Sequence, residues 1–506
     1  MTSVKKLNPW LPEKWDFEED VVIVGYGGAG ASAAIASHDA GVKAVVLEKA
    51  PVGGGNTATA GPGFSVPADV DKGIEYYRAL TFGTVDEELI RTLVETIHGI
   101  PGWLEKLGSK PRLIKQKPWH PSLPGSDGFR MMKFPPTPRK AGQKPGNIPG
   151  DWIFQFLNNK VKERRVEVLY EFPATGLIQD PLTKEIVGVR AKDSSRKVIY
   201  VKARRGVILA CGGFENNREM LTQFMPFSVK LPIYPMGTPY NTGDGVYMAT
   251  EVGAQLWHMT SVELGNFAPK APSEKFGMGF RLIRQMPRRG TAIYVNKYGK
   301  RFMDESVLLS HSREFFKVQH FDGEQAEFPN IPFFMIFDEI YRRRGPIVGR
   351  SDSWWNYQNI YNWSQDNSAE IKQGWIVSAE TVGELAEKIE VPPKALEETV
   401  NRYNRICSQQ KDADFGRDKD WLVPVETPPF YATELCEPII NTQGGPKHNA
   451  HAQVLDKGNR PIPRLYAAGE LGSIYFPLYL IGGNMAEALA SGRIAGEQAA
   501  ALTSWA

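Results

Sequence analysis

Cysteine and long apolar runs are both scarce in this chain. Its 506 residues include three cysteines, Cys211, Cys407 and Cys436, which are scattered and lack metal-ligand spacing. This pattern excludes a disulfide framework, predicts no metal site and is typical of a reducing compartment. No apolar stretch reaches the roughly 18 residues of a membrane-spanning helix, and the polar N-terminal segment does not resemble a secretory signal. We therefore expect a cytoplasmic protein.

An excess of one charge is also absent. The 60 basic and 57 acidic side chains leave a net charge of about +3, and no basic run is interleaved with aromatic residues. Nucleic acid is therefore not expected as a partner. The chain is too long for one simple core, which predicts two domains or one domain with a large insertion. Its 49 glycines suit close contacts between backbone and a cofactor.

A dinucleotide-binding fingerprint lies near the N-terminus. An apolar strand over residues 21–24 leads directly into Gly25-Tyr-Gly27-Gly28-Ala29-Gly30. Gly25 permits a tight turn, Gly27 lets the backbone approach a pyrophosphate, and Gly30 allows close packing of helix and strand. The N-terminus of the following helix then faces the phosphates.

Two further features select the ligand. Glu48, eighteen residues past Gly30, closes the next apolar run and can bind ribose hydroxyls, which favours FAD or NAD over NADP. Near the C-terminus, Gly482-Gly483-Asn484 opens a small-residue helix over residues 485–500. Its N–H groups and dipole suit the flavin edge that becomes negative on reduction. The two ends of the chain together indicate FAD.

The order of apolar segments predicts an α/β fold. We expect a Rossmann-like FAD-binding domain of the glutathione-reductase type, residues 1–267 and 425–506, with an inserted α+β cap or catalytic domain, residues 268–424. Strands are expected at 167–170, 188–193, 198–201, 206–210, 292–296 and 333–338, and helices at 86–108, 378–390 and 393–409. The glycine-rich residues 53–63 and the proline-rich residues 110–150 are expected to form loops.

Motifs along the whole chain resemble those of one flavoprotein superfamily, the FAD-dependent fumarate reductases and 3-ketosteroid dehydrogenases. The matching segments lie in the family's order, at 22–30, 54–57, 210–214, 241–245, 295–302, 444–445, 463–470 and 487–496. The resemblance implies FAD held between two domains and hydride exchange with a carbon next to a carbonyl or carboxylate. Together with the fingerprint it assigns the cofactor to Gly25, Gly27, Gly28, Ala29, Gly30, Glu48, Lys49, Gly54, Gly55, Asn56, Thr57, Gly61, Gly63, Ala210, Gly212, Gly213, Asp244, Glu470, Asn484 and Met485.

The residues that handle dicarboxylates in fumarate reductases are absent. Leu309 and Leu480 stand where that family has arginines, and residues 440–443 contain no counterpart of its histidine pair. A fumarate or succinate substrate is therefore not expected. The chain is more similar to the ketosteroid dehydrogenases, which act on ring ketones.

The ketosteroid dehydrogenase pattern is itself rearranged. Residues 118–125 resemble the family's aromatic loop, but Trp119 or His120 occupies the place of its tyrosine. Tyr479 lies three residues before Gly482, the counterpart of the glycine whose N–H polarises the ketone, and Tyr475 lies seven before it. The third family tyrosine, which follows the Arg-Phe motif at 301–302, is replaced here by Leu308 and Leu309, and His311 lies close by in the sequence. The catalytic candidates are Tyr479, Gly482, His120, Tyr475, Trp119 and His311.

Desaturation beside a carbonyl needs a hydride acceptor, a base and a group that stabilises the enolate. We assign the enolate oxygen to the Gly482 N–H and the Tyr479 hydroxyl, at a helix N-terminus that favours negative charge. The alternative for Tyr479 is simple packing over the flavin. His120 is the first candidate for the base, because histidine titrates near neutral pH.

The sequence therefore predicts an FAD-dependent dehydrogenase that introduces a C=C bond next to the carbonyl of a cyclic ketone. The substrate is a 3-ketosteroid or a smaller ring such as 4-oxocyclohexanecarboxylate. The alternative is an ene-reductase that runs in the opposite direction, and a non-enzymatic flavoprotein ranks third. Since no haem-attachment motif is present, the electron acceptor is expected to be external: a quinone, a dye-like carrier or O₂.

Overall fold

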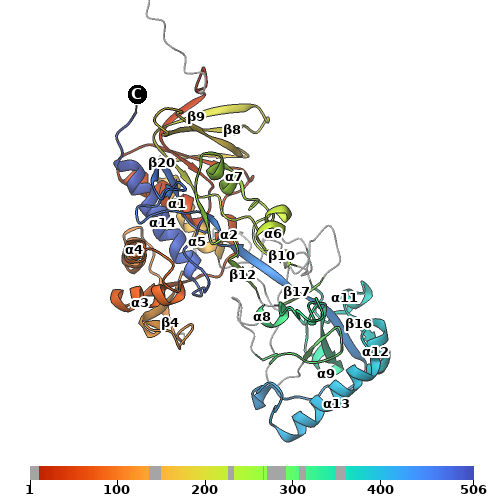
Figure 1. Ribbon diagram of the computed structural model, residues 1–506. Coiled ribbons are helices and arrows are strands. Elements are labelled where there is room, and N and C mark those ends of the chain that lie inside the picture. The colour runs from red at the N-terminus through yellow and green to blue at the C-terminus, as the bar shows by residue number, and fades with distance from the viewer. Residues whose placement is uncertain are drawn as a thin grey trace, which may run out of the picture. The chain divides into compact units, whose positions relative to one another are not determined.

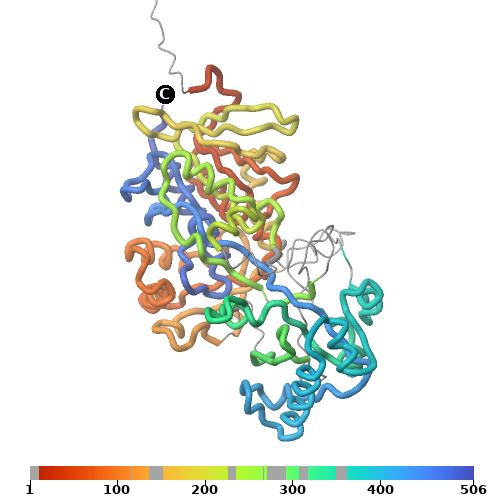
Figure 2. Tube along the Cα trace, turned by 45° about the vertical axis from the view of Figure 1, so that its right-hand side comes forward, coloured from red at the N-terminus to blue at the C-terminus, as the bar shows by residue number. Residues whose placement is uncertain are grey.

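The computed structural model describes residues 11–115, 117–135, 150–225, 233–265, 267–270, 292–306, 315–348, 361 and 363–505. Its contacts divide the chain into two units, which can be followed in Figures 1 and 2. Unit 1 comprises Met1–Met220, Gly237–Val262 and Asn441–Ala506, and unit 2 comprises Leu221–Met236 and Glu263–Ile440. Among the described residues, no helix combines the length and apolar character needed to cross a bilayer.

The boundaries between the units differ from those expected at 268 and 424. The reason is strand β17 (Phe430–Thr442), which pairs residue by residue with β15 (Phe333–Asp338) and so belongs to the sheet of unit 2 as far as Ile440. The segment Leu221–Met236 joins the same unit, because its strand β10 (Ile233–Pro235) pairs in parallel with β17.

Unit 1 is built on an eight-stranded sheet. Its strands in spatial order are β19 (Gln453–Leu455), β20 (Pro461–Ala467), β9 (Val198–Leu209), β1 (Phe17–Val24), β2 (Ala44–Glu48) and β6 (Glu167–Tyr170), with β8 (Ile186–Lys192) paired to β9 and β7 (Ala174–Gln179) paired to β8. The strands from β20 to β6 are parallel, and the last four residues of β1 are buried. This burial on both faces explains the unbroken apolar run of residues 21–24.

One strand is longer than its sequence pattern indicates. Residues 198–201 and 206–210 were expected as separate strands, yet they form the single strand β9. The polar residues between them stay extended because β9 pairs with β1 from Val201 to Leu209, with a register shift between Glu19 and Val21. The expected strand at 167–170 is confirmed as β6.

The helices of unit 1 include the two that begin with the glycine motifs. They are α1 (Gly28–Asp39), α2 (Gly55–Thr59), α3 (Val70–Leu80), α4 (Glu87–Lys106), α5 (Gly150–Glu163), α7 (Asp244–Glu251) and α14 (Gly483–Ala501), while α6 (Arg218–Phe224) crosses the unit boundary. Helices α1 and α14, from opposite ends of the chain, lie side by side (Figure 1). A Cβ atom at Gly492 would lie 2.3 Å from the carbonyl oxygen of Ala29, so the helices touch through their backbones.

The two segments expected as loops contribute to regular structure. The glycine-rich residues 53–63 contain the short helix α2 and lead into β3 (Gly63–Pro67). The proline-rich segment supplies β4 (Arg112–Ile114), the 3-10 turn η1 (Ser126–Gly128) and β5 (Phe129–Lys133), and these strands form a three-stranded antiparallel sheet with β3. A further two-stranded sheet joins β11 (Leu256–Trp257) to β18 (Gly445–Pro446).

Unit 2 has its own sheet and core. Strand β17 pairs with β10, β12 (Val262–Leu264), β13 (Ala268–Pro269), β15 and β16 (Val377–Ala379), and β15 pairs with β14 (Ile293–Asn296). The helices are α8 (Phe315–Val318), α9 (Glu339–Arg342), α11 (Ser368–Lys372), α12 (Val382–Lys388) and α13 (Pro393–Gln409), with a 3-10 turn η3 (Lys419–Trp421). The expected helix at 378–390 is thus shorter, because residues 377–379 pair with β17.

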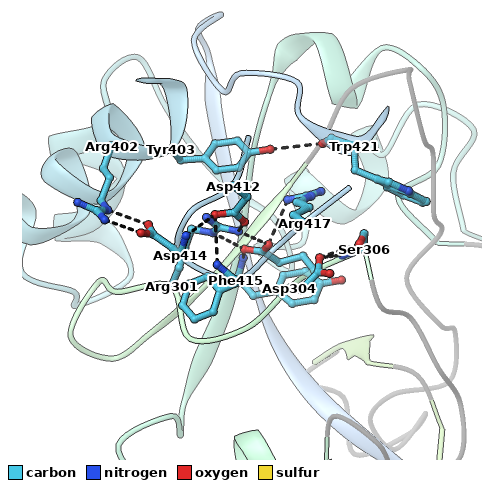
Figure 3. Close-up of polar contacts among 12 residues, drawn as sticks. Arg301, Asp304, Ser306, Arg402, Tyr403, Asp412, Asp414, Phe415, Arg417 and Trp421 are labelled. Carbon is cyan, nitrogen blue, oxygen red and sulfur yellow. Dashed lines mark hydrogen bonds and ion pairs between the residues drawn. The ribbon is translucent and has the colours of Figure 1, made fainter. Parts of the chain in front are cut away.

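A buried ion network holds part of unit 2 together (Figure 3). Arg301 donates to both carboxylate oxygens of Glu305, at 2.8 and 2.7 Å, and to Asp412 at 3.1 Å. Arg417 donates to Glu305 at 3.1 Å and also to the carbonyl oxygen of Ala292. All four charged side chains are at most 4% exposed. Arg301 of the Arg-Phe motif therefore has a structural role, because it ties the segment after β14 to the segment after α13.

The contact between α1 and α14 predicts that a glycine-to-alanine substitution lowers the stability of unit 1 at Gly492 but not at Gly99. Gly492→Ala should lower stability by about 1–3 kcal/mol, because the Cβ has no room beside Ala29 and the helices must separate. Gly99→Ala is the matched control, since nothing lies within 4 Å of its Cβ position in α4; it should be neutral or stabilising by up to about 1 kcal/mol. Thermal unfolding of both variants tests this, and equal melting temperatures would contradict it.

Candidate active site

The turn between β1 and α1 is shaped by three glycines. Gly25 has φ +102°, and a Cβ there would lie 2.4 Å from the carbonyl oxygen of Ala210. A Cβ at Gly30 would lie 2.0 Å from the carbonyl oxygen of Gly25, so helix and strand are in backbone contact. At Gly27, in contrast, the nearest atom is 3.7 Å away. A side chain at Gly27 would make only ordinary van der Waals contact, so packing of the protein does not require glycine there, whereas the close approach of a pyrophosphate predicted by the fingerprint does.

Two helix N-termini in unit 1 suit an anionic ligand. Helix α1 follows Gly27 and α14 follows Gly482, and neither cap residue has a side chain to satisfy the first N–H groups. Neither helix has an acidic residue in its first turn. The positive ends of both helices thus lack a negative partner from their own first turns, which fits a pyrophosphate at one and a reduced flavin ring at the other.

Glu48 ends β2 beside the glycine turn. Its carboxylate accepts from the Tyr26 N–H at 2.8 Å and from the Ala50 N–H at 2.7 Å. Burial raises the pKa of Glu48, and these hydrogen bonds oppose that shift. A carboxylate has about four acceptor positions, so this arrangement retains acceptors for ribose hydroxyls.

Other predicted cofactor residues contact one another across unit 1. The Gly28 N–H donates to Thr57 Oγ1 at 2.9 Å, which joins the fingerprint to the glycine-rich segment. Lys49 forms an ion pair with Asp244 and donates to Thr242 Oγ1 at 2.6 Å. Asn484 exchanges two amide hydrogen bonds with Gln443, at 2.8 and 3.0 Å. Each of these contacts joins segments of unit 1 that are distant in the sequence.

A pair of acidic side chains lies at the ends of β9 and β20. Glu215 and Glu470 each accept from the side-chain amides of Asn56 and Asn241, at 2.7 to 2.9 Å. Burial raises the pKa of both carboxyls, and the charge of Glu215 adds to the shift of Glu470. Sequence reasoning missed Glu215, although it directly follows the Gly-Gly-Phe segment at 212–214 that the family resemblance singles out.

Five of the six catalytic candidates lie together near the N-terminus of α14. His120 Nε2 is 3.1 Å from the carbonyl oxygen of Tyr479, and the rings of His120 and Trp119 have centroids 5.9 Å apart. The Tyr479 hydroxyl accepts from the Asn484 N–H at 3.3 Å. Gly482 is the cap residue of the same helix. The sixth candidate, His311, lies outside the described residues, as do Leu308 and Leu309.

Tyr475 is the most enclosed of these candidates. Its hydroxyl is 2.6 Å from that of Tyr77, and its ring packs edge-on against that of Tyr479 at 5.0 Å. A Cβ at Gly483 would lie 2.2 Å from the Tyr475 hydroxyl, so this oxygen touches the start of α14. Burial raises the pKa of Tyr475 far above its usual range, which keeps the phenol protonated. Sequence reasoning missed Tyr77, which lies on the distant helix α3 without any motif.

Comparison with known proteins identifies the family. The FAD binding domain family matches residues 20–485. The chain belongs to this family of FAD-dependent oxidoreductases. FAD is therefore its cofactor, as the two glycine motifs predict. This flavoprotein would hold it through the turn at Gly27, the Glu48 carboxylate and the first N–H groups of α1 and α14.

The relatives of this flavoprotein include both dehydrogenases and reductases. It is 29% identical to the NADH:acrylate oxidoreductase of Vibrio harveyi over 99% of this chain and 52% of that protein. It is 28% identical to the 3-oxosteroid 1-dehydrogenase of Mycolicibacterium smegmatis over 90% of this chain and 92% of that protein. The urocanate reductase of Eggerthella lenta is 27% identical over 98% and 77% of the two chains. The chain thus spans about half the length of the acrylate oxidoreductase.

Solved structures confirm the fold class. The 3-ketosteroid delta1-dehydrogenase of Sterolibacterium denitrificans superposes with a TM-score of 0.80 at 22% identity, over 96% of this chain and 99% of that chain. A flavocytochrome c3 fumarate reductase gives 0.71 at 25% identity, over 96% and 78% of the two chains. At this level of identity the likeness to the steroid enzyme concerns the fold alone.

The position of Glu48 predicts a specific loss of cofactor. Glu48→Ala should weaken FAD binding about ten-fold or more, since a charge-assisted hydrogen bond contributes about 1.5–3 kcal/mol and about 1.4 kcal/mol is a factor of ten. Glu18→Ala, at the exposed start of β1, is the matched control and should bind FAD normally. Flavin fluorescence during titration of the apoprotein measures the affinity, and circular dichroism checks folding. Unchanged affinity in folded Glu48→Ala would disprove the ribose assignment.

Proposed function

We propose that this flavoprotein is a dehydrogenase that introduces a C=C bond α,β to the carbonyl of a cyclic ketone. The observation that carries the proposal is the grouping of Tyr479, Gly482 and His120 at the N-terminus of α14, in the unit that contains the dinucleotide fingerprint. These three residues offer the two functions that the reaction needs from the protein, an oxyanion site and a base.

The oxyanion site consists of the Gly482 N–H and the Tyr479 hydroxyl. The Gly482 N–H has no hydrogen-bond partner among the described residues. The Tyr479 oxygen accepts from the Asn484 N–H, and such a bond polarises the phenol and strengthens its own donation. Negative charge on a substrate oxygen here is also favoured by the dipole of the 19-residue helix α14.

His120 is assigned as the base for the α-proton. A carbonyl oxygen only accepts hydrogen bonds, so the contact between His120 Nε2 and the Tyr479 carbonyl requires the proton on Nε2. In the neutral ring the lone pair is then on Nδ1, which is the atom that takes the α-proton. The same contact holds the imidazole next to the residue that binds the ketone.

Bound FAD supplies the hydride acceptor for the carbon β to the carbonyl. The electrons then pass to an external acceptor, for which a quinone, a dye-like carrier and O₂ are the candidates. The proposed substrates are a 3-ketosteroid and a smaller ketone such as 4-oxocyclohexanecarboxylate. The match to a 3-oxosteroid 1-dehydrogenase over nearly the whole of both chains supports this reading.

A second candidate function is ene reduction, the reverse reaction. The similarity to the acrylate oxidoreductase and the urocanate reductase favours it. The two functions share the oxyanion site. In the dehydrogenase the saturated ketone reduces the flavin, whereas in the ene-reductase the unsaturated compound reoxidises it. Anaerobic mixing of the oxidised protein with each ketone, followed by flavin absorbance, distinguishes them, because only a dehydrogenase bleaches its flavin with a saturated ketone.

The assignment of Tyr479 predicts a loss of rate without loss of cofactor. Tyr479→Phe should keep FAD and its fold but reduce its flavin with ketone about 10²–10³-fold more slowly, the usual effect of removing one oxyanion donor. Stopped-flow absorbance under anaerobic conditions measures this rate. Tyr475→Phe is the control, because its hydroxyl is already bonded to that of Tyr77, and it should lose much less rate. If Tyr479→Phe reacts as fast as the wild type, the oxyanion role lies elsewhere and His120 is the next residue to test.

The site composition also predicts that fumarate is not a substrate. A dicarboxylate needs cationic partners for both carboxylates, but Leu480 is apolar and buried and Asn441 is neutral. We expect that fumarate oxidises a reduced dye in the presence of the protein no faster than in the presence of free flavin. A cyclic enone in the same assay serves as the comparison, because its reduction would reveal ene-reductase activity. Turnover of fumarate at ordinary enzyme rates would contradict the assignment to the ketone-dehydrogenase branch.

A further inference from the structure

The acid pair Glu215 and Glu470 has an arrangement that the proposed reaction does not use. The amide nitrogen of Asn56 donates to Oε1 of both carboxyls, at 2.8 and 2.9 Å, and that of Asn241 does the same at 2.8 and 2.7 Å. Each amide therefore uses both of its hydrogens, one on each acid. The two carboxyl groups are held within reach of the same two nitrogen atoms.

Neither acid has a cationic partner among the described residues. Their hydrogen-bond donors are neutral amides, and the neighbouring lysine, Lys49, is already paired with Asp244. Two carboxylates this close, without a counter-ion and with little exposure to water, do not both ionise, because each charge raises the proton affinity of the other. Charge repulsion from Glu215 accordingly raises the pKa of Glu470 beyond the effect of burial.

One carboxyl oxygen of the acid pair lacks a hydrogen-bond donor among the described residues. Glu215 is fully buried, and its Oε2 has no hydrogen-bond partner among the described residues. Both this oxygen and Thr442 Oγ1 lie against Gly213, where a Cβ would be 2.8 and 2.2 Å from them. A buried carboxylate oxygen without a donor is costly, whereas a protonated carboxyl needs fewer donors. A proton on this Glu215 oxygen would remove that cost.

The acid pair lies at the edge of the sheet where the cofactor motifs converge. Glu215 follows β9 and Glu470 follows β20, and these parallel neighbours carry the pair at their carboxyl ends. Asn56 precedes Thr57, whose hydroxyl accepts from Gly28 of the fingerprint. Glu470 and Asn56 keep partial exposure, while Glu215 and Asn241 are buried behind them. In open parallel sheets this edge is where ligands bind.

We propose that Glu215 and Glu470 share one proton at neutral pH and take up a second when the bound FAD is reduced. Reduction adds negative charge to the cofactor, and a nearby negative charge raises the proton affinity of a carboxylate. The electrons come from the reductant and the proton from water, so charge at the site is balanced. The proposal rests on the FAD cofactor and not on the ketone substrate.

Other titratable groups near the pair do not replace it in this role. Lys49 and Asp244 contact Thr242, the neighbour of Asn241, and their charges offset each other. Burial raises the pKa of the Cys211 thiol to about 12, so it stays protonated throughout. Glu48 is held by two backbone N–H groups of its own.

The test is the pH dependence of the flavin midpoint potential in the holoprotein. If the acid pair takes up a proton when the flavin is reduced, the midpoint potential falls with rising pH. Between neutral and mildly alkaline pH this fall is steeper than it would be without that proton. We expect the steep slope in the wild type and a shallower slope in both Glu215→Gln and Glu470→Gln. Glu437→Gln, which removes a buried acid from unit 2, is the matched control and should keep the wild-type slope. Equal slopes in the wild type and Glu215→Gln would overturn the proposal.

A second measurement works without the cofactor, in case a variant binds FAD poorly. Infrared spectra of the apoprotein at neutral pH, in H₂O and D₂O, detect protonated carboxyl groups. A shared proton requires that Glu215→Gln and Glu470→Gln each change the same band, because either substitution alters one of the two carboxyl groups between which the proton is exchanged. A band that changes in only one of the variants, or in neither, would show that the acids do not share a proton.

Discussion

Backbone contact between distant segments is the constraint on which unit 1 depends. A Cβ at Gly492 would press on the Ala29 carbonyl, and one at Gly25 would press on that of Ala210. Because these segments touch without intervening side chains, β1, β9 and β20 lie next to one another with α1 and α14 packed together. The carboxyl ends of three parallel strands thereby meet at one edge. Groups separated by more than 400 residues, such as Asn56 and Glu470, come into hydrogen-bond contact there.

The two units compensate buried carboxylates in different ways. In unit 2, Glu305 accepts from two arginines, so its charge is held permanently and stabilises the fold. In unit 1 the donors are neutral: Glu487 accepts from the Ser473 hydroxyl and the Ile474 N–H, and burial raises its pKa to about 7. Neutral donors leave a buried acid ready to exchange a proton near neutral pH. Glu487 joins Glu215 and Glu470 as a buried acid of unit 1 whose donors are neutral.

The start of α14 combines cofactor and substrate chemistry in one helix end. Its first N–H groups suit a reduced flavin, while Tyr479 and Tyr475 contact the same turn through Asn484 and Gly483. In the proposed reaction, the dipole of this single helix would stabilise two negative charges, one on the reduced flavin and one on the substrate oxygen.

The sequence by itself determined the cofactor and the local elements around it. The glycine turn, Glu48 and the helix after Gly482 could be identified because each motif is local, and periodicity sufficed for α4, β15 and α13. The remaining strand limits and the unit boundary depend on which strands pair with one another in the folded chain. Residues 202–205 are strand because β1 lies beside them, and β17 moved the unit boundary because it pairs with β15. The contacts of Asn56 with Glu215 and Glu470, and of Tyr77 with Tyr475, join residues 159 to 414 positions apart. No local pattern encodes such contacts, since only packing of the folded chain brings these side chains within hydrogen-bond distance.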